Sequence, residues 1–146
     1  MVKNNGKRLR ILLVEDDEYD VQLTERALSK SDVDSELYVV WDGEEALDFL
    51  YQRGEFEDSP EPDLVLLDLK LPKIGGHEVL EKVKEDESLR HIPVIVLTVS
   101  EREEDMVKAY DSGASSYIHK PVKPDEFGKV IQTVQEYWKM SELPPR

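Results

Sequence analysis

The sequence lacks cysteine, which excludes a disulfide framework, a thiolate zinc site and a cysteine nucleophile. It also lacks long hydrophobic runs. The longest aliphatic stretches, such as residues 11–14, have four residues, whereas a membrane-spanning helix needs ~20. Basic residues near the N-terminus are not followed by an apolar stretch and a small-residue cleavage site, so no signal peptide is predicted. These absences favour a cytoplasmic protein without a membrane segment.

Positive charge is scarce, because 19 Lys and Arg stand against 33 Asp and Glu, for a formal net charge of −14. Phosphate backbones and anionic lipid surfaces repel such a chain, which argues against nucleic-acid and membrane partners. The length of 146 residues predicts one domain. An apolar content of 39% is enough for a hydrophobic core, so we expect a folded, acidic globule.

The apolar residues alternate between two kinds of segment. Short β-branched and leucine-rich runs, apolar on both faces, are typical of parallel strands covered on both sides. The runs occupy residues 10–14, 36–41, 64–68, 94–98 and 116–119. Stripes with helical spacing lie between and after them, at 19–28, 46–51, 79–83, 106–110 and 127–138. This alternation predicts an α/β domain with a parallel sheet and helices on both faces.

Polar residues stand at the carboxyl ends of the runs, where parallel α/β sheets form their sites. These residues are Glu15, Asp16, Asp68, Thr98 and Lys120. If the first and third strands are adjacent, three carboxylates converge. Two carboxylates ~5 Å apart repel by about 3 kcal/mol at an effective dielectric near 20, so a cation is expected. Oxygen ligands of this kind suit Mg²⁺, and with a lysine and a threonine they can support phosphorylation of an aspartate.

Each residue also has a purely structural interpretation. The acids at 15–18 could form a solvated turn that caps a helix. Asp68 could be an ordinary loop residue, Thr98 an ordinary strand residue, and Lys120 with Pro121 a turn. Their joint occurrence at the ends of different strands favours the site.

Four motifs resemble a known family, the receiver domain of two-component response regulators. They lie at residues 11–17, 63–72, 94–98 and 119–121, and the resemblance covers about residues 8–140. It implies a flavodoxin-like (βα)5 three-layer sandwich with strand order 2-1-3-4-5. We expect the receiver domain at 9–140, between an N-terminal tail at 1–8 and a C-terminal tail at 141–146.

The resemblance implies a phosphoacceptor and a metal site. Asp68 would accept the phosphoryl group. Asp16 would bind Mg²⁺ directly, Glu15 directly or through water, and Asp68 and the backbone carbonyl of Lys70 would complete the protein ligands. The Lys70 side chain, two residues beyond Asp68, lies where receivers govern the attacking water.

Further roles follow from the same resemblance. Thr98 and Lys120 would bind phosphoryl oxygens, and Tyr117 would be the aromatic switch that turns inward with Thr98. Val99 occupies a position that is often Ala or Gly in receivers, so its larger side chain is expected to narrow access to the phosphate. Ser100, two residues beyond Thr98, is expected to influence the attacking water.

The finer resemblance is to stand-alone regulators that serve phytochrome-type kinases. It rests on the acidic loop at 54–63, on residues 68–73 and on the aromatic end at 136–138. It implies a light-sensing histidine kinase as partner. Because the length leaves no room for an output domain, an unknown downstream protein would recognise the surface of helix 4, strand 5 and helix 5, about residues 101–140. Two copies could also pair through that surface.

Two other functions could use the same residues. A Mg²⁺-dependent phosphohydrolase with an aspartate nucleophile needs Asp-x-Asp, but Lys70 stands two residues after Asp68. A flavin or nucleotide binder needs a Gly/Ser/Thr-rich loop after the first strand, where this chain has four acids. We therefore expect a signalling protein with at most slow self-dephosphorylation.

Overall fold

The computed structural model describes residues 8–30, 34–99, 102–120, 123, 125 and 129. Its elements are β1 (Leu9–Val14), α1 (Glu18–Ser29), β2 (Ser35–Val40), α2 (Gly43–Tyr51), the short 3-10 helix η1 (Gly54–Phe56), β3 (Leu64–Asp68), α3 (Gly76–Glu85), β4 (Val94–Thr98), α4 (Glu103–Asp111) and β5 (Ser116–His119). Ser100, both predicted tails except Arg8, and almost all of the stripe at 127–138 lie outside the described residues.

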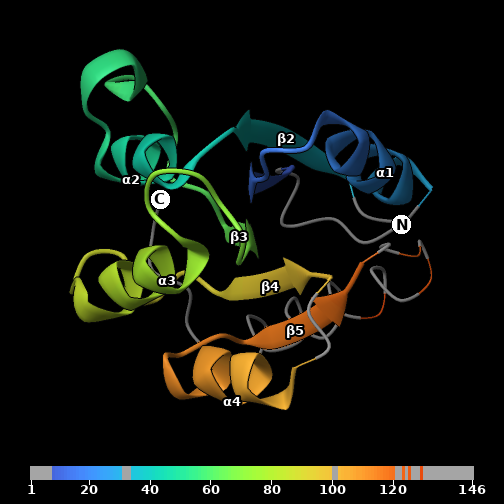
Figure 1. Ribbon diagram of the computed structural model, residues 1–146. Helices are drawn as coiled ribbons and strands as arrows, with labels where there is room; N and C mark the ends of the chain where they lie inside the picture. Colours follow the sequence, from blue (N-terminus) through green and yellow to red (C-terminus); the bar gives the residue numbers. More distant parts are fainter. Residues whose placement is uncertain are drawn as a thin grey trace.

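The five strands form one parallel sheet in the order β2-β1-β3-β4-β5 (Figure 1). The predicted fold and strand order are therefore confirmed. The register pairs Val14 with Leu67, Asp68 with Leu97, and Thr98 with His119. The strands thus end at nearly the same level, and the residues that follow them share one edge of the sheet.

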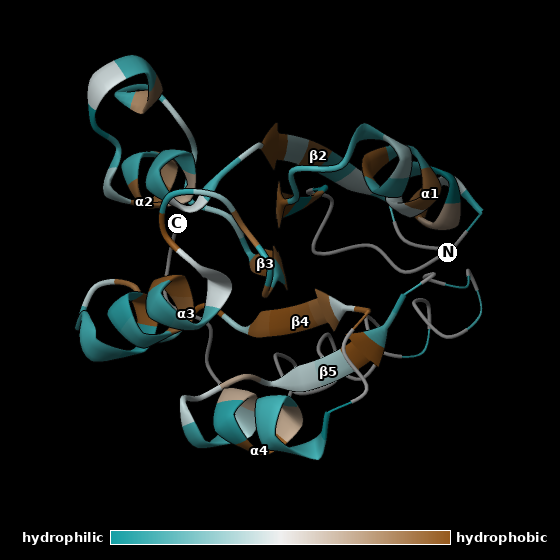
Figure 2. Cartoon of the chain, viewed as in Figure 1, coloured by the Kyte–Doolittle hydropathy of each residue, from teal (hydrophilic) through white to brown (hydrophobic). Residues whose placement is uncertain are grey.

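Helices cover the sheet on both faces, with α1 on one face and α2, α3 and α4 on the other (Figure 1). All residues of β3 and β4 are buried, which explains why their sequences are apolar without alternation. β4 is hydrophobic along its length, β2 and β5 are hydrophobic mainly at their ends, and the helices carry many polar residues (Figure 2). This three-layer packing holds the carboxyl ends of the strands in fixed positions.

The predicted helical stripes are less accurate than the strands. Tyr19 is 67% exposed, whereas Val21 and Thr24 of α1 are buried. On α4, Ala109 is the buried residue, and the predicted stripe of Met106, Val107 and Tyr110 is exposed. In the acidic loop at 54–63, Pro62 is buried and Phe56 packs against the core. Within the part of the chain that the structure describes, no helix is long and apolar enough to cross a bilayer.

Candidate functional site

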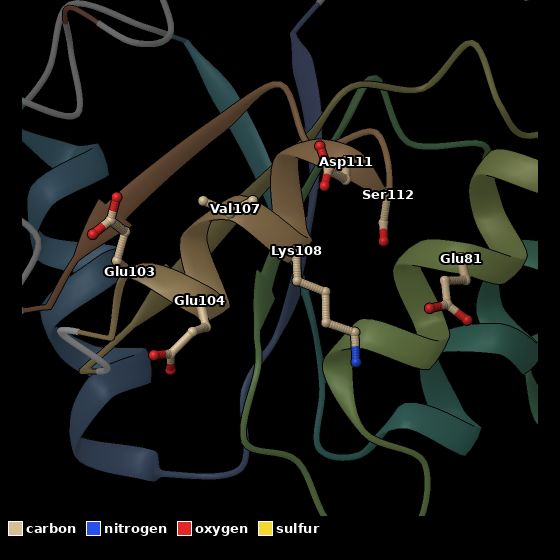
Figure 3. Close-up of a pocket in the computed structure, with 7 residues that line it drawn as sticks. All are labelled: Glu81, Glu103, Glu104, Val107, Lys108, Asp111 and Ser112. Atoms are coloured by element: carbon tan, nitrogen blue, oxygen red, sulfur yellow. The ribbon is translucent and has the colours of Figure 1, made fainter.

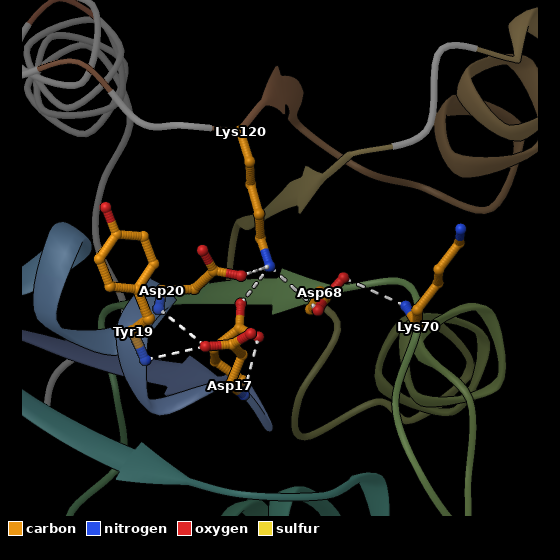
Figure 4. Close-up of polar contacts among 7 residues, drawn as sticks. Asp17, Tyr19, Asp20, Asp68, Lys70 and Lys120 are labelled. Carbon is orange, nitrogen blue, oxygen red and sulfur yellow. Dashed lines mark hydrogen bonds and ion pairs between the residues drawn. The ribbon is translucent and has the colours of Figure 1, made fainter.

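Lys120 lies at the centre of the polar cluster at the carboxyl edge of the sheet (Figure 4). Its Nζ is 3.0 Å from Asp20 Oδ2 and 3.1 Å from Asp68 Oδ2, and it also donates to Glu15 Oε2. Only 8% of the Lys120 side chain, 8% of Asp68 and 2% of Glu15 are exposed. The ammonium is therefore held between carboxylates that come from the ends of β1 and β3 and from α1.

The turn from β1 into α1 fixes Glu15. Asp17 is the N-cap of α1, and its Oδ1 accepts from the backbone N–H groups of Tyr19 and Asp20 at 2.8 and 3.2 Å. The N–H of Asp17 donates to Glu15 Oε1 at 3.2 Å. The capping interpretation of this acidic turn is thus correct for Asp17, while Glu15 beside it faces Lys120.

The turn from β3 into α3 fixes Asp68. The N–H of Lys70 donates to Asp68 Oδ1 at 3.1 Å, and the N–H of Gly76 donates to Leu69 O at 3.0 Å. A Cβ atom on Gly76 would lie 2.3 Å from the carbonyl oxygen of Asp68 and 2.6 Å from Leu69 Cα. The first turn of α3 therefore packs directly on the backbone that carries Asp68, and a glycine is needed there.

Three carboxylates form a set that could hold a metal ion. Oxygens of Glu15, Asp16 and Asp68 lie within 4.8 Å of one another; Glu15 and Asp68 are buried and Asp16 is exposed. Hard oxygen donors at this spacing fit a small divalent cation that keeps some of its waters. The exposed Asp16 leaves one side of the set open to solvent.

The electrostatics of the cluster follow from burial. Burial raises the pKa of Glu15 to about 7, against the hydrogen bond from Lys120 and with help from the negative charge of Asp68. Burial lowers the pKa of Lys120, but the hydrogen bond to Glu15 and the charges of Asp68 and Glu15 outweigh it, so the net shift is upward. Lys120 thus stays an ammonium and supplies positive charge to the carboxylates.

The remaining predicted residues lie on β4 and β5. Thr98 ends β4 and is fully buried, and its carbonyl oxygen accepts from the N–H of Lys120 at 2.9 Å. Tyr117 on β5 is half-buried, with its ring centroid 5.8 Å from that of His119. Val99 is 59% exposed. The ends of β4 and β5 are therefore joined by their backbones next to the carboxylate cluster.

The sequence does not predict Asp20 as a site residue, although its carboxylate contacts Lys120. In the sequence it is one more acid in an acid-rich turn. Since the feature that distinguishes it is a contact between residues 100 positions apart, local spacing carries no signal for it.

A separate hollow of about 650 Å³ lies between α3 and α4 (Figure 3). It is lined by Glu81, Glu103, Glu104, Val107, Lys108, Asp111 and Ser112. None of these residues belongs to the carboxylate cluster, so the hollow is distinct from the site around Lys120.

Comparison with protein families matches residues 11–132 to the response regulator receiver domain. The chain belongs to this family. Receiver domains are phosphorylatable signalling domains, and the carboxyl-edge cluster of this receiver holds a buried lysine in contact with buried carboxylates. The match lends no support to the alternative of a phosphohydrolase.

Relatives of known identity agree with this assignment. Response regulator Rcp1 of Synechocystis sp. is 42% identical over 128 residues, which are 88% of this chain and 87% of the relative. The crystal structure of its Mn²⁺-bound form superposes with a TM-score of 0.77 at 40% identity, covering 94% of this chain and 99% of that one.

Two further solved structures are similar. The bacteriophytochrome response regulator AtBRR has a TM-score of 0.80 at 44% identity, covering 96% of this chain and 100% of that one. The phosphorylated cyanobacterial phytochrome response regulator RcpA has a TM-score of 0.79 at 39% identity, covering 95% and 100%. Both alignments thus cover nearly the whole chain.

Proposed function

We propose that Asp68 accepts a phosphoryl group from a sensor histidine kinase, and that the receiver domain, at residues 9–140, signals through the resulting change of its surface. The observation that carries the proposal is the buried Lys120 ammonium in contact with Asp68 at the carboxyl edge of the sheet. A positive charge at this position can stabilise negative charge on a phosphoryl group as it is transferred.

In the proposed step an Asp68 carboxylate oxygen attacks the phosphorus of a phosphohistidine. The new O–P bond forms as the N–P bond breaks, and the imidazole leaves with the electron pair. Lys120 pairs with one phosphoryl oxygen and the Thr98 hydroxyl donates to another. The burial of Thr98 and Lys120 supports these roles, because hydrogen bonds to charged oxygens are stronger away from water.

The metal in this proposal is Mg²⁺. Glu15, Asp16 and Asp68 would hold it through their carboxylates, and Lys70 through its backbone carbonyl. When bound, it would neutralise charge on the phosphoryl oxygens. The spacing of the three carboxylates supports a divalent ion, and the relative Rcp1 has been solved with Mn²⁺.

Labelling by acetyl phosphate tests the phosphoacceptor and the metal together. We expect the protein to gain one phosphoryl group in Mg²⁺, located on Asp68 by peptide mass spectrometry, and to gain none when EDTA removes the metal. Acetate is the leaving group in this reaction. Turnover of p-nitrophenyl phosphate over many cycles would contradict the proposal and support a hydrolase instead.

The lifetime of the phosphorylated state is proposed to depend on access of water. Val99 is 59% exposed directly after Thr98, so its side chain can shield the phosphoryl group, with contributions from Lys70 and Ser100. Val99→Ala is expected to shorten the lifetime by about two- to fivefold, since a smaller side chain opens the approach of water. Equal lifetimes in the parent and the variant, measured by loss of the label, would remove this role.

The partner and the output surface complete the proposal. Because similar proteins are named as phytochrome response regulators, we infer a phytochrome-type histidine kinase as the phosphoryl donor and the cytoplasm as the location. Inward rotation of Tyr117 with Thr98 would change the surface formed by α4, β5 and the following segment. The exposed Met106, Val107 and Tyr110 of α4 give that surface an apolar patch for a downstream protein or a second copy.

A further inference from the structure

Asp20 differs from the other two acids that contact Lys120. Glu15 and Asp68 belong to the set of three carboxylates whose oxygens lie within 4.8 Å of one another, and Asp20 is outside that set. It comes from the first turn of α1, and its Oδ2 lies 3.0 Å from Lys120 Nζ (Figure 4). Its side chain is 25% exposed. Lys120 therefore has one carboxylate partner that is not a candidate metal ligand.

The position of Asp20 is fixed by the helix that carries it. The N–H of Asp20 donates to Asp17 Oδ1, the N-cap of α1, at 3.2 Å. The first turn of α1 follows directly on the end of β1, which is buried in the sheet. Asp20 is thus a carboxylate on a capped helical turn, and it and Asp68 lie on either side of the Lys120 ammonium (Figure 4).

A divalent cation changes the surroundings of Lys120. Once Glu15 and Asp68 share their charge with the cation, less of it remains to hold the ammonium, and the cation itself repels Lys120. Among the described residues, Asp20 is the remaining acid in contact with Lys120 whose charge the cation would not share. An ammonium has three N–H donors, so a bond to Asp20 leaves two for Glu15 and for a phosphoryl oxygen.

We propose that Asp20 is a positioning residue that holds the Lys120 ammonium beside Asp68 while a cation and a phosphoryl group are present. This inference rests on the proposed function, because it assigns a role to Asp20 in phosphorylation of Asp68. Asp20 itself touches neither the phosphoryl group nor the metal. It acts through Lys120, whose position next to Asp68 is what phosphoryl transfer needs.

Labelling rates with acetyl phosphate in Mg²⁺ test the proposal. We expect Asp20→Ala to slow labelling by between about three- and tenfold, since a contact to a charged group is lost. Asp20→Asn keeps the shape of the side chain and one oxygen that can accept from Lys120, so it should label faster than Asp20→Ala. The matched control is Glu18→Gln, which removes one exposed charge from the same helical turn and should stay within about twofold of the parent.

A second measurement needs neither metal nor label. In a double-mutant cycle of Asp20→Ala with Lys120→Met, unfolded by urea without metal, the two changes should be non-additive by at least about twofold in the unfolding equilibrium constant. The same cycle with Glu18→Gln in place of Asp20→Ala should be additive. The labelling comparison does not use Lys120→Met, so it still decides the matter if that variant does not fold.

The outcomes separate this inference from the proposed function. A parent that takes no label at all would overturn the proposed function. A parent that is labelled normally, with Asp20→Ala indistinguishable from Glu18→Gln, would overturn the role of Asp20 alone. Faster labelling of Asp20→Ala would also overturn it, because Asp20 would then be competing with the phosphoryl group for Lys120.

Discussion

Asp68→Asn is expected to accept no phosphoryl group, either from a histidine kinase or from acetyl phosphate. The amide oxygen of asparagine is not a useful nucleophile, so the O–P bond cannot form. The fold should remain intact, because asparagine has the same shape and its oxygen can still accept from the N–H of Lys70, as Asp68 Oδ1 does at 3.1 Å. Labelling in Mg²⁺, followed by intact-mass measurement, checks the prediction.

The same substitution has an electrostatic consequence inside the cluster. Burial raises the pKa of Glu15 to about 7, and the charge of Asp68 adds to this rise. Removing that charge should lower the pKa of Glu15, which can be followed by NMR titration of its carboxyl carbon in the absence of metal.

The matched control for the labelling of Asp68→Asn is Asp58→Asn, in the exposed loop, which should be labelled like the parent. Equal labelling of Asp68→Asn and the parent would show that Asp68 is not the phosphoacceptor.

Gly76→Ala is expected to lower the free energy of unfolding by about 3 kcal/mol, which is large for the addition of one methyl group. The new Cβ would lie 2.3 Å from the carbonyl oxygen of Asp68 and 2.6 Å from Leu69 Cα. Both are backbone atoms of the strand end and its turn, so neither can rotate away. The start of α3 must move instead, and the Asp68 carboxylate should move with the turn, so labelling should also slow.

Gly75→Ala provides the control one residue earlier. A Cβ on Gly75 meets no atom within 4 Å, and its φ of −69° suits any residue. Because it is the N-cap of α3, alanine should change the free energy of unfolding by less than about 1 kcal/mol. Urea denaturation of both variants measures the difference. Similar losses in the two would mean that the contact between Gly76 and the Asp68 backbone does not limit the packing.

The central strands could be predicted well because burial on both faces makes their sequences distinctive. The predicted runs at 64–68, 94–98 and 116–119 agree with β3, β4 and β5, and 10–14 begins one residue late for β1. The edge strand β2 was shifted by one residue, from 36–41 to Ser35–Val40. Most of β2 is only partly buried, and Trp41 after it is 45% exposed. The apolar run in the sequence therefore does not show where β2 ends.

The helices show what periodicity cannot determine. A spacing of three or four residues predicts a helix, but the packing against the sheet decides which side is covered. On α4 the small Ala109 faces the core, while the larger Met106 and Tyr110 are exposed. α1 begins after its N-cap, Asp17, and the helix places Tyr19 on its exposed side. Residue size was therefore a misleading guide to burial in both helices.

The site could be predicted in part for a related reason. Glu15 and Asp68 follow β1 and β3, which are neighbours in the sheet, so the topology predicts that they meet. Lys120 follows β5, which β4 separates from β3, and its side chain reaches both carboxylates from there. Asp20 lies inside a helix, where neither strand order nor spacing specifies its neighbours. Its contact with Lys120 depends on how α1 lies across the sheet, which the sequence does not state locally.

The contacts of Lys120 with Glu15, Asp20 and Asp68 span 105, 100 and 52 positions of the chain. During synthesis the acids emerge from the ribosome long before the lysine does. Until β5 has joined the sheet edge, the acids at the ends of β1 and β3 lack their ammonium, and each such closure is slow compared with local structure. The ability of Asp68 to accept a phosphoryl group should therefore arise late in folding. An incompletely folded chain would then not be phosphorylated.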